Sequence, residues 1–175
     1  MKAKRILRTF LIIAVLCCNI GCDQVSKTIV RQTVEYNEQI SLVNSFLVLT
    51  KVENTGAFLS IGNSLPRTAR IILLNLLPLL VLGFAFIYLV TKKNLSNRMM
   101  IGLSFVIGGG LGNLYDRILY GSVTDFLHMD FILFRTGIFN MADVSIMIGT
   151  FLLLMDISYK SNQLMDHSEE KQNEV

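Results

Sequence analysis

Two carboxylic acids in the second half of the sequence, Asp125 and Asp143, are candidates for acid–base chemistry. Asp125 stands in a segment that we expect to form an outer loop, and Asp143 stands near the start of the apolar helix that follows it. Two carboxyl groups brought within a few ångström cannot both ionise cheaply, so they share one proton. One can then take a proton from water while the other donates to a carbonyl oxygen, as in an aspartic protease.

Further polar residues have helical spacings that allow a structural role as well as a functional one. Asp23 and Lys27 are four residues apart, so an ion pair on a helix surface explains them as well as a site does. Asn140 and Asp143 have the spacing of a helix N-cap and an acid in the first turn. Both roles can hold at once for Asp143, because a helix N-terminus is a rigid mount for a carboxylate.

A glycine-rich segment, "IGGGLGNLYDR", occupies residues 107–117. Ser104, Gly108 and Gly112 recur at four-residue intervals, which allows another helix or a ligand to approach the backbone closely. An apolar substrate helix could use this face. Asn113 and Arg117 are also four residues apart and should project together.

Other catalytic chemistries find little support in the sequence. Asp125, His128 and Asp130 include suitable metal ligands, but the second histidine, His167, is far away near the end of the chain. The sequence has neither a G-x-S-x-G nor an H-E-x-x-H motif. All three cysteines lie within residues 17–22, in an apolar run, where we expect buried free thiols. We therefore expect no metal and no cofactor.

The composition indicates a membrane protein. The chain has 175 residues, of which 52% are hydrophobic and 17% charged, and its mean hydropathy is +0.53, too apolar for an ordinary soluble domain. Its net charge of +3 is small and its basic residues are dispersed, which does not favour nucleic-acid binding.

The apolar runs predict four transmembrane helices, since a spanning helix needs about 20 apolar residues. We place them at residues 6–26, 70–91, 98–115 and 140–159. The segment before the first span and the link between the second and third carry basic residues without acids, so both should be cytoplasmic. Both termini are then cytoplasmic.

This topology brings the polar ends of the spans together at the outer face of the membrane. Asp23 and Lys27 should end the first span there, and Asn113, Asp116 and Arg117 the third. The connection at residues 28–66 alternates in places and ends in "ENTGAF", which predicts a small β-cradle. Residues 161–175 should form a polar cytoplasmic tail that is disordered, and residues 1–160 the membrane domain.

Five motifs in this order resemble those of the lipoprotein signal peptidases (signal peptidase II), which are bacterial intramembrane aspartyl proteases. They are "DQVSK" at 23–27, "ENTGAF" at 53–58, "GGGLGNLYDR" at 108–117, "VTDF" at 123–126 and "FNMADVSI" at 139–146. The resemblance covers roughly residues 6–160. It departs where the family commonly has G-A-A-F and this chain has Phe58 and Leu59 after Gly56 and Ala57.

The resemblance implies an all-α membrane bundle of four transmembrane helices with a small extracytoplasmic β-cradle. It implies that Asp125 and Asp143 are the catalytic dyad. The residues that it assigns to binding or support are Asp23, Lys27, Asn54, Gly56, Asn113, Asp116, Arg117 and Asn140. The implied enzyme is a monomer of the bacterial inner membrane, in contact with membrane lipids, that needs no metal. It removes the signal peptide from diacylglyceryl-modified prolipoproteins by cleaving before the lipidated cysteine.

The first apolar run could itself be mistaken for a lipoprotein signal peptide that is cut before Cys22. A lipobox requires an aliphatic residue three positions before the cysteine, where this chain has Asn19, and three further spans follow. We expect the segment to be retained. The alternative function is a small proton- or cation-coupled transporter or lipid-binding membrane protein, which would use the same carboxylates as a relay.

Overall fold

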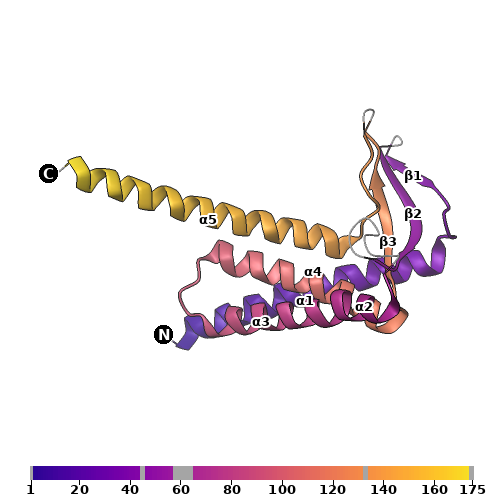
Figure 1. Cartoon of the computed structure of the whole chain (residues 1–175), viewed down its shortest axis with the longest axis horizontal. Helices are drawn as coiled ribbons and strands as arrows, with labels where there is room; N and C mark the ends of the chain where they lie inside the picture. The colour runs from indigo at the N-terminus through magenta and orange to yellow at the C-terminus, as the bar shows by residue number, and fades with distance from the viewer. Residues whose placement is uncertain (1, 44–45, 57–64, 132–133, 174–175) are drawn as a thin grey trace.

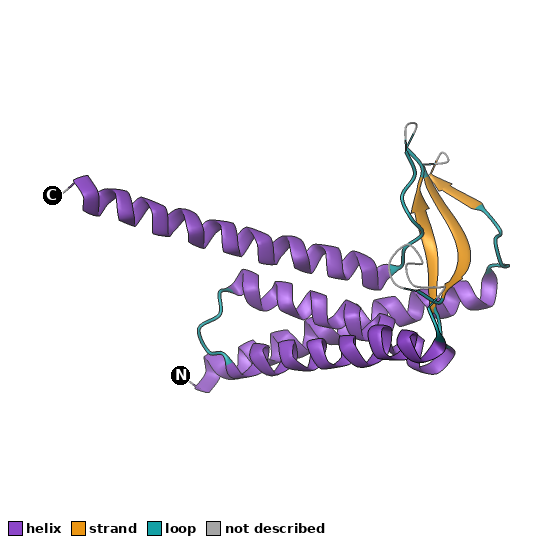
Figure 2. Ribbon diagram, viewed as in Figure 1, coloured by secondary structure: helices purple, strands orange, loops and turns teal. Residues whose placement is uncertain are grey.

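The computed structural model describes residues 2–43, 46–56, 65–131 and 134–173 of the chain. Long helices lie side by side, and a small sheet stands across one end of the bundle, opposite both termini (Figures 1 and 2). The helices are α1 (Lys2–Thr33), α2 (Arg67–Ile71), the π-helical η2 (Ile72–Leu76), α3 (Leu77–Thr91), α4 (Asn97–Tyr120) and α5 (Met141–Asn173). The strands are β1 (Ile40–Val43), β2 (Leu47–Asn54) and β3 (Val123–Met129).

Three helical stretches within the described residues are long and apolar enough to cross a membrane. They are Arg5–Thr33, Arg67–Thr91 and Met141–Ser161. The second runs through α2, η2 and α3, and its π-helical turn precedes Pro78, which has no N–H to donate to the preceding turn.

The predicted span at 98–115 lies inside α4, but α4 does not reach the same hydropathy. Its 24 residues are about 36 Å long, which is enough to cross the hydrocarbon core of a bilayer. The helix packs against α1, α3 and α5, and its buried residues include glycines together with Ser104, Asn113 and Asp116. These small and polar residues lower the hydropathy of α4. The helix can carry them because they contact the other helices.

The glycines of α4 are close-packing positions for the other helices. A Cβ at Gly108 would lie 2.9 Å from the Cβ of Asn19 in α1, and one at Gly112 would lie 2.6 Å from Asp23 Oδ2. The prediction of close helix packing is therefore confirmed. The expectation that this face leaves room for a substrate helix is wrong, because α1 occupies it.

Helix α1 is longer than the predicted span. We expected it to end near residue 26, but it continues to Thr33, so Asp23 and Lys27 lie within the helix. Both are fully buried, and their charges are compensated by residues of α4 as described below. Compensated charges do not require the helix to stop at the membrane boundary.

The small sheet differs from the expected cradle in its composition. Strands β1 and β2 lie in the predicted interval, but β3 comes from residues that we expected to form a loop. The sheet is antiparallel with the order β1-β2-β3, and it pairs Val52 with Asp125 and Asn54 with Val123. Asp125 is thereby held on a strand rather than on a loop.

Three other expectations concern surface segments. The cysteines at 17, 18 and 22 are exposed on α1 rather than buried, because the polar residues of that helix face the bundle. Residues 161–173 continue α5 as a helix, whereas we expected a disordered tail; the segment contains no proline or glycine to end it. Ala57, Phe58 and Leu59, where the sequence departs from the family pattern, lie outside the described residues.

Candidate active site

Asp125 is held by amide groups from two directions. Its Oδ2 accepts a hydrogen bond of 2.9 Å from Asn54 Nδ2, at the end of the neighbouring strand β2. Its Oδ1 accepts a hydrogen bond of 2.6 Å from Asn140 Nδ2, at the start of α5. Asn54 is itself oriented, because its Oδ1 accepts the backbone N–H of Gly56 at 2.9 Å. The carboxyl group therefore sits where the sheet meets the bundle.

Asp143 belongs to a reciprocal cap at the N-terminus of α5. The Asn140 side-chain oxygen accepts the N–H of Asp143 at 3.1 Å, and Asp143 Oδ2 accepts the N–H of Asn140 at 3.2 Å. This geometry confirms the predicted N-cap. The remaining oxygen, Asp143 Oδ1, accepts a hydrogen bond of 2.8 Å from Asn113 Nδ2 in α4. The cap therefore holds the Asp143 carboxylate in place through Oδ2, while Oδ1 bonds to Asn113.

The two aspartates border the same small cavity. Its volume is about 20 Å³, which is enough for one water molecule. The cavity is lined by Asn54, Asn113, Arg117, Val123, Asp125, Ile138, Asn140 and Asp143. Seven of the residues that the sequence predicts for the site line this cavity or bond to a residue that lines it: Asn54, Gly56, Asn113, Arg117, Asp125, Asn140 and Asp143.

The environment of Asp125 favours its protonated form. Burial and, to a lesser extent, the negative charge of Asp143 raise the pKa of this carboxyl from its ordinary value of 3.8 to about 6. The hydrogen bonds from Asn54 and Asn140 oppose the rise because they stabilise the carboxylate. A carboxyl group whose pKa is raised in this way keeps its proton to a higher pH than an exposed aspartate, which suits a proton donor.

Arg117 connects the cavity with the segment that follows β2. Its Nη2 donates a hydrogen bond of 3.0 Å to the carbonyl oxygen of Gly56. Asn113 and Arg117 line the same cavity, as their spacing of four residues in α4 predicted. Arg117 thus places a positive charge beside the two aspartates and holds the backbone at Gly56.

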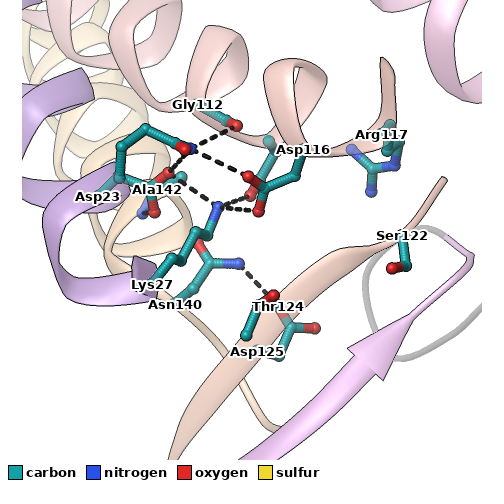
Figure 3. A network of polar contacts seen from close by, with 12 residues as sticks. Asp23, Lys27, Gly112, Asp116, Arg117, Ser122, Thr124, Asp125, Asn140 and Ala142 are labelled. Atoms are coloured by element: carbon teal, nitrogen blue, oxygen red, sulfur yellow. Dashed lines mark hydrogen bonds and ion pairs between the residues drawn. The ribbon is translucent and has the colours of Figure 1, made fainter. Parts of the chain in front are cut away.

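A buried network of charges supports the site from the interior of the bundle (Figure 3). Lys27 Nζ lies 2.8 Å from Asp23 Oδ2 and 3.0 Å from Asp116 Oδ2, and it donates a hydrogen bond of 2.9 Å to Asn113 Oδ1. The first pair is the predicted one, but it is fully buried rather than on a helix surface. Because Lys27 binds the oxygen of Asn113, the amide nitrogen of Asn113 must point to Asp143.

Asp23 joins the network to the helix that carries Asp143. Its Oδ1 accepts the backbone N–H of Ala142 at 2.9 Å, in the first turn of α5. The N–H groups of a first turn have no partner within the helix, and a carboxylate is a favourable partner for them. Asp23 therefore fixes α5 against α1.

Two residues of this network were missed by the sequence analysis. Arg31 lies 2.9 Å from Asp116 Oδ2 through Nη2, and its Nε donates a hydrogen bond of 2.8 Å to Thr124 Oγ1, next to Asp125. Gln24 donates hydrogen bonds to Asp23, Asp116 and the carbonyl oxygen of Gly112. The four-residue spacing from Asp23 through Lys27 to Arg31 puts these three residues on one face of α1, and this spacing is the sequence signal for Arg31.

The geometry of β3 separates the candidate metal ligands. Asp125 and His128 are three residues apart on a strand, so their side chains point to opposite faces of the sheet. Asp130 forms an ion pair with Arg135, with 2.7 Å between the charged atoms. Within the described part of the chain, no group of three histidine, cysteine or acidic residues is arranged to hold a metal ion.

Comparison with known proteins identifies the family. Residues 13–159 match the family model described as signal peptidase (SPase) II. The chain belongs to the signal peptidase II family. It is 37% identical over 136 residues to the lipoprotein signal peptidase of Streptococcus agalactiae serotype V, covering 78% of this chain and 84% of the relative. The lipoprotein signal peptidase of Brevibacillus brevis is 36% identical over 148 residues, covering 85% and 93% of the two chains.

Two solved structures share the fold of this chain. One structure, described as a bacterial membrane enzyme, superposes with a TM-score of 0.78 at 24% identity and covers 87% of this chain and 90% of its own. A second structure with the same description has a TM-score of 0.75 at 24% identity, with 84% and 92% covered. Membership of the signal peptidase II family makes the chain a protease and gives no support to the alternative of a transporter or lipid-binding protein.

Proposed function

We propose that this member of the signal peptidase II family is an intramembrane aspartyl endopeptidase whose catalytic dyad is Asp125 and Asp143. Its substrates are prolipoproteins modified with diacylglycerol, and it cleaves the signal peptide before the lipidated cysteine. One observation carries the assignment of the dyad. Both carboxyl groups border a cavity of about 20 Å³, and Asn140 bonds to both residues.

The reaction needs one protonated and one ionised carboxyl group. Asp143 takes a proton from a water molecule in the cavity, and the resulting hydroxide attacks the scissile carbonyl carbon while Asp125 donates its proton to the carbonyl oxygen. The tetrahedral intermediate then collapses as its C–N bond breaks. The proton on Asp143 moves to the leaving amine. Asp125 regains a proton from a hydroxyl group of the intermediate. No metal or cofactor enters any step.

The environment of Asp125 supports this division of roles. Its raised pKa, about 6, keeps the acid protonated at a higher pH than an exposed aspartate. Asp143 accepts hydrogen bonds from the side chain of Asn113 and from the backbone N–H of Asn140, so both of its oxygens are held beside the cavity.

The proposal includes four transmembrane spans, with α4 as the third, and both termini in the cytoplasm. Its support is the length of α4, the position of both termini at the end opposite the sheet (Figure 1), and the basic residues near those ends. The sheet and the dyad would then lie near the outer face of the inner membrane. The enzyme would act as a monomer, with lipids covering its exposed apolar side chains.

In this arrangement the lipid tails of the substrate stay in the bilayer. The extended residues around the scissile bond would lie against the sheet, where Asn54, Gly56 and Arg117 border the dyad. Asp23, Lys27 and Asp116 do not contact the cavity, and we assign them the role of holding α1, α4 and α5 in register.

Substitution of the acids tests the dyad. Asp125→Asn and Asp143→Asn should each lower turnover of a lipidated prolipoprotein by about 10³-fold or more, while the protein still inserts and accumulates. Asp130→Asn is the matched control, because Asp130 follows the same strand but pairs with Arg135 outside the cavity. It should keep normal turnover. Near-normal turnover of either dyad variant in a purified assay would refute the assignment.

Two further arms of the same assay test the substrate and the metal. An unlipidated version of the prolipoprotein should be cleaved poorly, and equal cleavage of both forms would refute the proposed specificity. Treatment with EDTA should leave turnover unchanged. A loss that Zn²⁺ or Mg²⁺ restores would point to metal chemistry in place of the acid pair.

A further inference from the structure

A second cavity is lined in part by Arg117. Its volume is about 600 Å³, within the range of cavities that bind small molecules. It is formed by the start of the second apolar helix, around α2 and η2, and by the end of α4. Arg117 is the one described residue that it shares with the catalytic cavity. Neither aspartate of the dyad lines it.

Three arginines give the lining of this cavity a positive charge. Arg67, Arg70 and Arg117 line it, and none of its described lining residues is acidic. No ion pair within the described part of the chain involves these arginines, whereas Lys27 and Arg31 nearby are paired. The Nε atoms of Arg70 and Arg117 are buried and have no hydrogen-bond partner among the described residues. A buried donor without a partner costs about 1–3 kcal/mol, so a bound acceptor would stabilise this end of the bundle.

Guanidinium groups select the chemistry of the acceptor. Arginine presents several N–H donors in a planar fork that fits the oxygens of a phosphate group. A carboxylate would fit one arginine, but a phosphate can accept hydrogen bonds from more than one side. The three arginines therefore favour a phosphate anion.

The rest of the cavity indicates that this phosphate is attached to an apolar molecule. The same cavity is lined by Ile71, Leu74, Ile118 and Leu119. Ile71, Ile118 and Leu119 are also exposed on the surface of the bundle. Ile71 and Leu74 lie near the start of Arg67–Thr91, an apolar stretch long enough to cross a bilayer, and this start lies near the sheet, as does the end of α4 (Figure 1). Lipid phosphates lie at that level of a membrane, directly beyond the hydrocarbon core.

We propose that the cavity between α2, η2 and the end of α4 binds the phosphate of an anionic membrane phospholipid. The arginines bind the phosphate oxygens, and the acyl chains lie along the exposed apolar residues. The ligand is distinct from the lipid of the proposed substrate, because a diacylglyceryl group carries no phosphate. Since Arg117 lines both cavities, bound phospholipid would also hold Arg117 and, through it, the backbone at Gly56.

Binding to the purified full-length chain tests this proposal without any substrate. The protein is prepared in an uncharged maltoside detergent and titrated with phosphatidylglycerol, and bound lipid is counted by native mass spectrometry while thermal unfolding is followed in parallel. We expect one tightly bound molecule and a rise in Tm. The double variant Arg67→Gln/Arg70→Gln should bind about 10- to 30-fold more weakly. The control is Lys92→Gln/Lys93→Gln, which removes the same charge beyond the other end of α3 and should bind normally.

Four results would overturn the proposal. Unchanged binding by the Arg67/Arg70 variant would show that these residues do not form the site, and an equal loss in the Lys92/Lys93 variant would show non-specific attraction. Diacylglycerol with the same acyl chains tests the phosphate, and equal binding of it would exclude phosphate recognition. Inorganic phosphate tests the lipid, and an equal rise in Tm would identify a free anion as the ligand. The last two comparisons use the unaltered chain, so they decide the question even if the arginine variant does not fold.

Discussion

Asn140 donates a hydrogen bond of 2.6 Å from its side-chain nitrogen to Asp125 Oδ1. The oxygen of the same amide accepts the N–H of Asp143 at 3.1 Å. A single side chain therefore sets the position of a strand carboxyl and a helix carboxyl relative to each other. This explains why a residue with the features of an ordinary helix cap lies at the centre of the proposed dyad.

Loss of this amide should reduce turnover far more than stability. Asn140→Ala should lower kcat about 100-fold, because a displacement of about 1 Å at the reacting groups has that effect, and destabilise the protein by about 1 kcal/mol. The measurements are cleavage of a lipidated prolipoprotein and thermal unfolding. Ser96→Ala is the control, since Ser96 caps α4 by accepting the N–H of Met99 at 3.0 Å. It should lose similar stability and keep its turnover; a similar fall in kcat for both variants would contradict the specific role of Asn140.

The raised pKa of Asp125 predicts how stability depends on pH. The unfolded chain ionises this group near its ordinary value of 3.8, and the folded chain ionises it near 6. Between these values the folded state binds more protons, so the free energy of unfolding should fall as pH rises from about 4 to about 6. The full difference corresponds to about 3 kcal/mol.

Asp125→Asn should remove this pH-dependent loss. The measurement is the difference in Tm between the variant and the unaltered protein, followed from pH 4 to pH 7 in detergent. The Tm of the variant should rise relative to that of the unaltered protein as the pH increases from about 4 to about 6. Asp130→Asn should run parallel to the unaltered protein, since Asp130 lies outside the cavity. Parallel curves for Asp125→Asn as well would show that Asp125 is not the group responsible.

Lys27 should be essential for stability. Lys27→Met leaves Asp23 buried without its cation and removes the group that orients Asn113, so we expect a destabilisation of about 3–5 kcal/mol. The double variant Lys27→Met/Asp23→Asn should recover part of it, because it leaves no uncompensated charge. Arg135→Met breaks an exposed ion pair and should change stability by less than about 1 kcal/mol. Equal, small effects of Lys27→Met and Arg135→Met on Tm would disprove the role of the network.

Gly112 should tolerate no side chain. In Gly112→Ala the new Cβ would lie 2.6 Å from Asp23 Oδ2 and displace the carboxylate that binds the N–H of Ala142, so we expect a loss of about 1–3 kcal/mol. Gly83→Ala is the control, because no atom lies within 4 Å of the added Cβ. It should be neutral or stabilise α3 by up to about 1 kcal/mol. Thermal unfolding compares the two, and a Gly112→Ala variant as stable as Gly83→Ala would contradict the packing of α1 on α4.

The sequence predicted the polar residues of the site better than the elements that carry them. The spacing of Asn140 and Asp143 predicted the cap, and that of Asn113 and Arg117 predicted their common face, because both depend on contacts within one helix. Strand β3 was expected as a loop, since its pairing with β2 depends on residues about seventy positions away. Local patterns carry no information on such pairing.

The sequence by itself determined that this chain is apolar enough for a membrane, that acids and amides recur at helix ends, and that its motifs are those of signal peptidase II. Only the tertiary structure decided that Asp125 and Asp143 share one cavity, that α1 covers the glycines of α4, and that Lys27 is buried between two acids. The physical reason is the same in each case. A buried charge or a bare glycine is stable only with the right partner, and that partner lies in a distant segment of the chain.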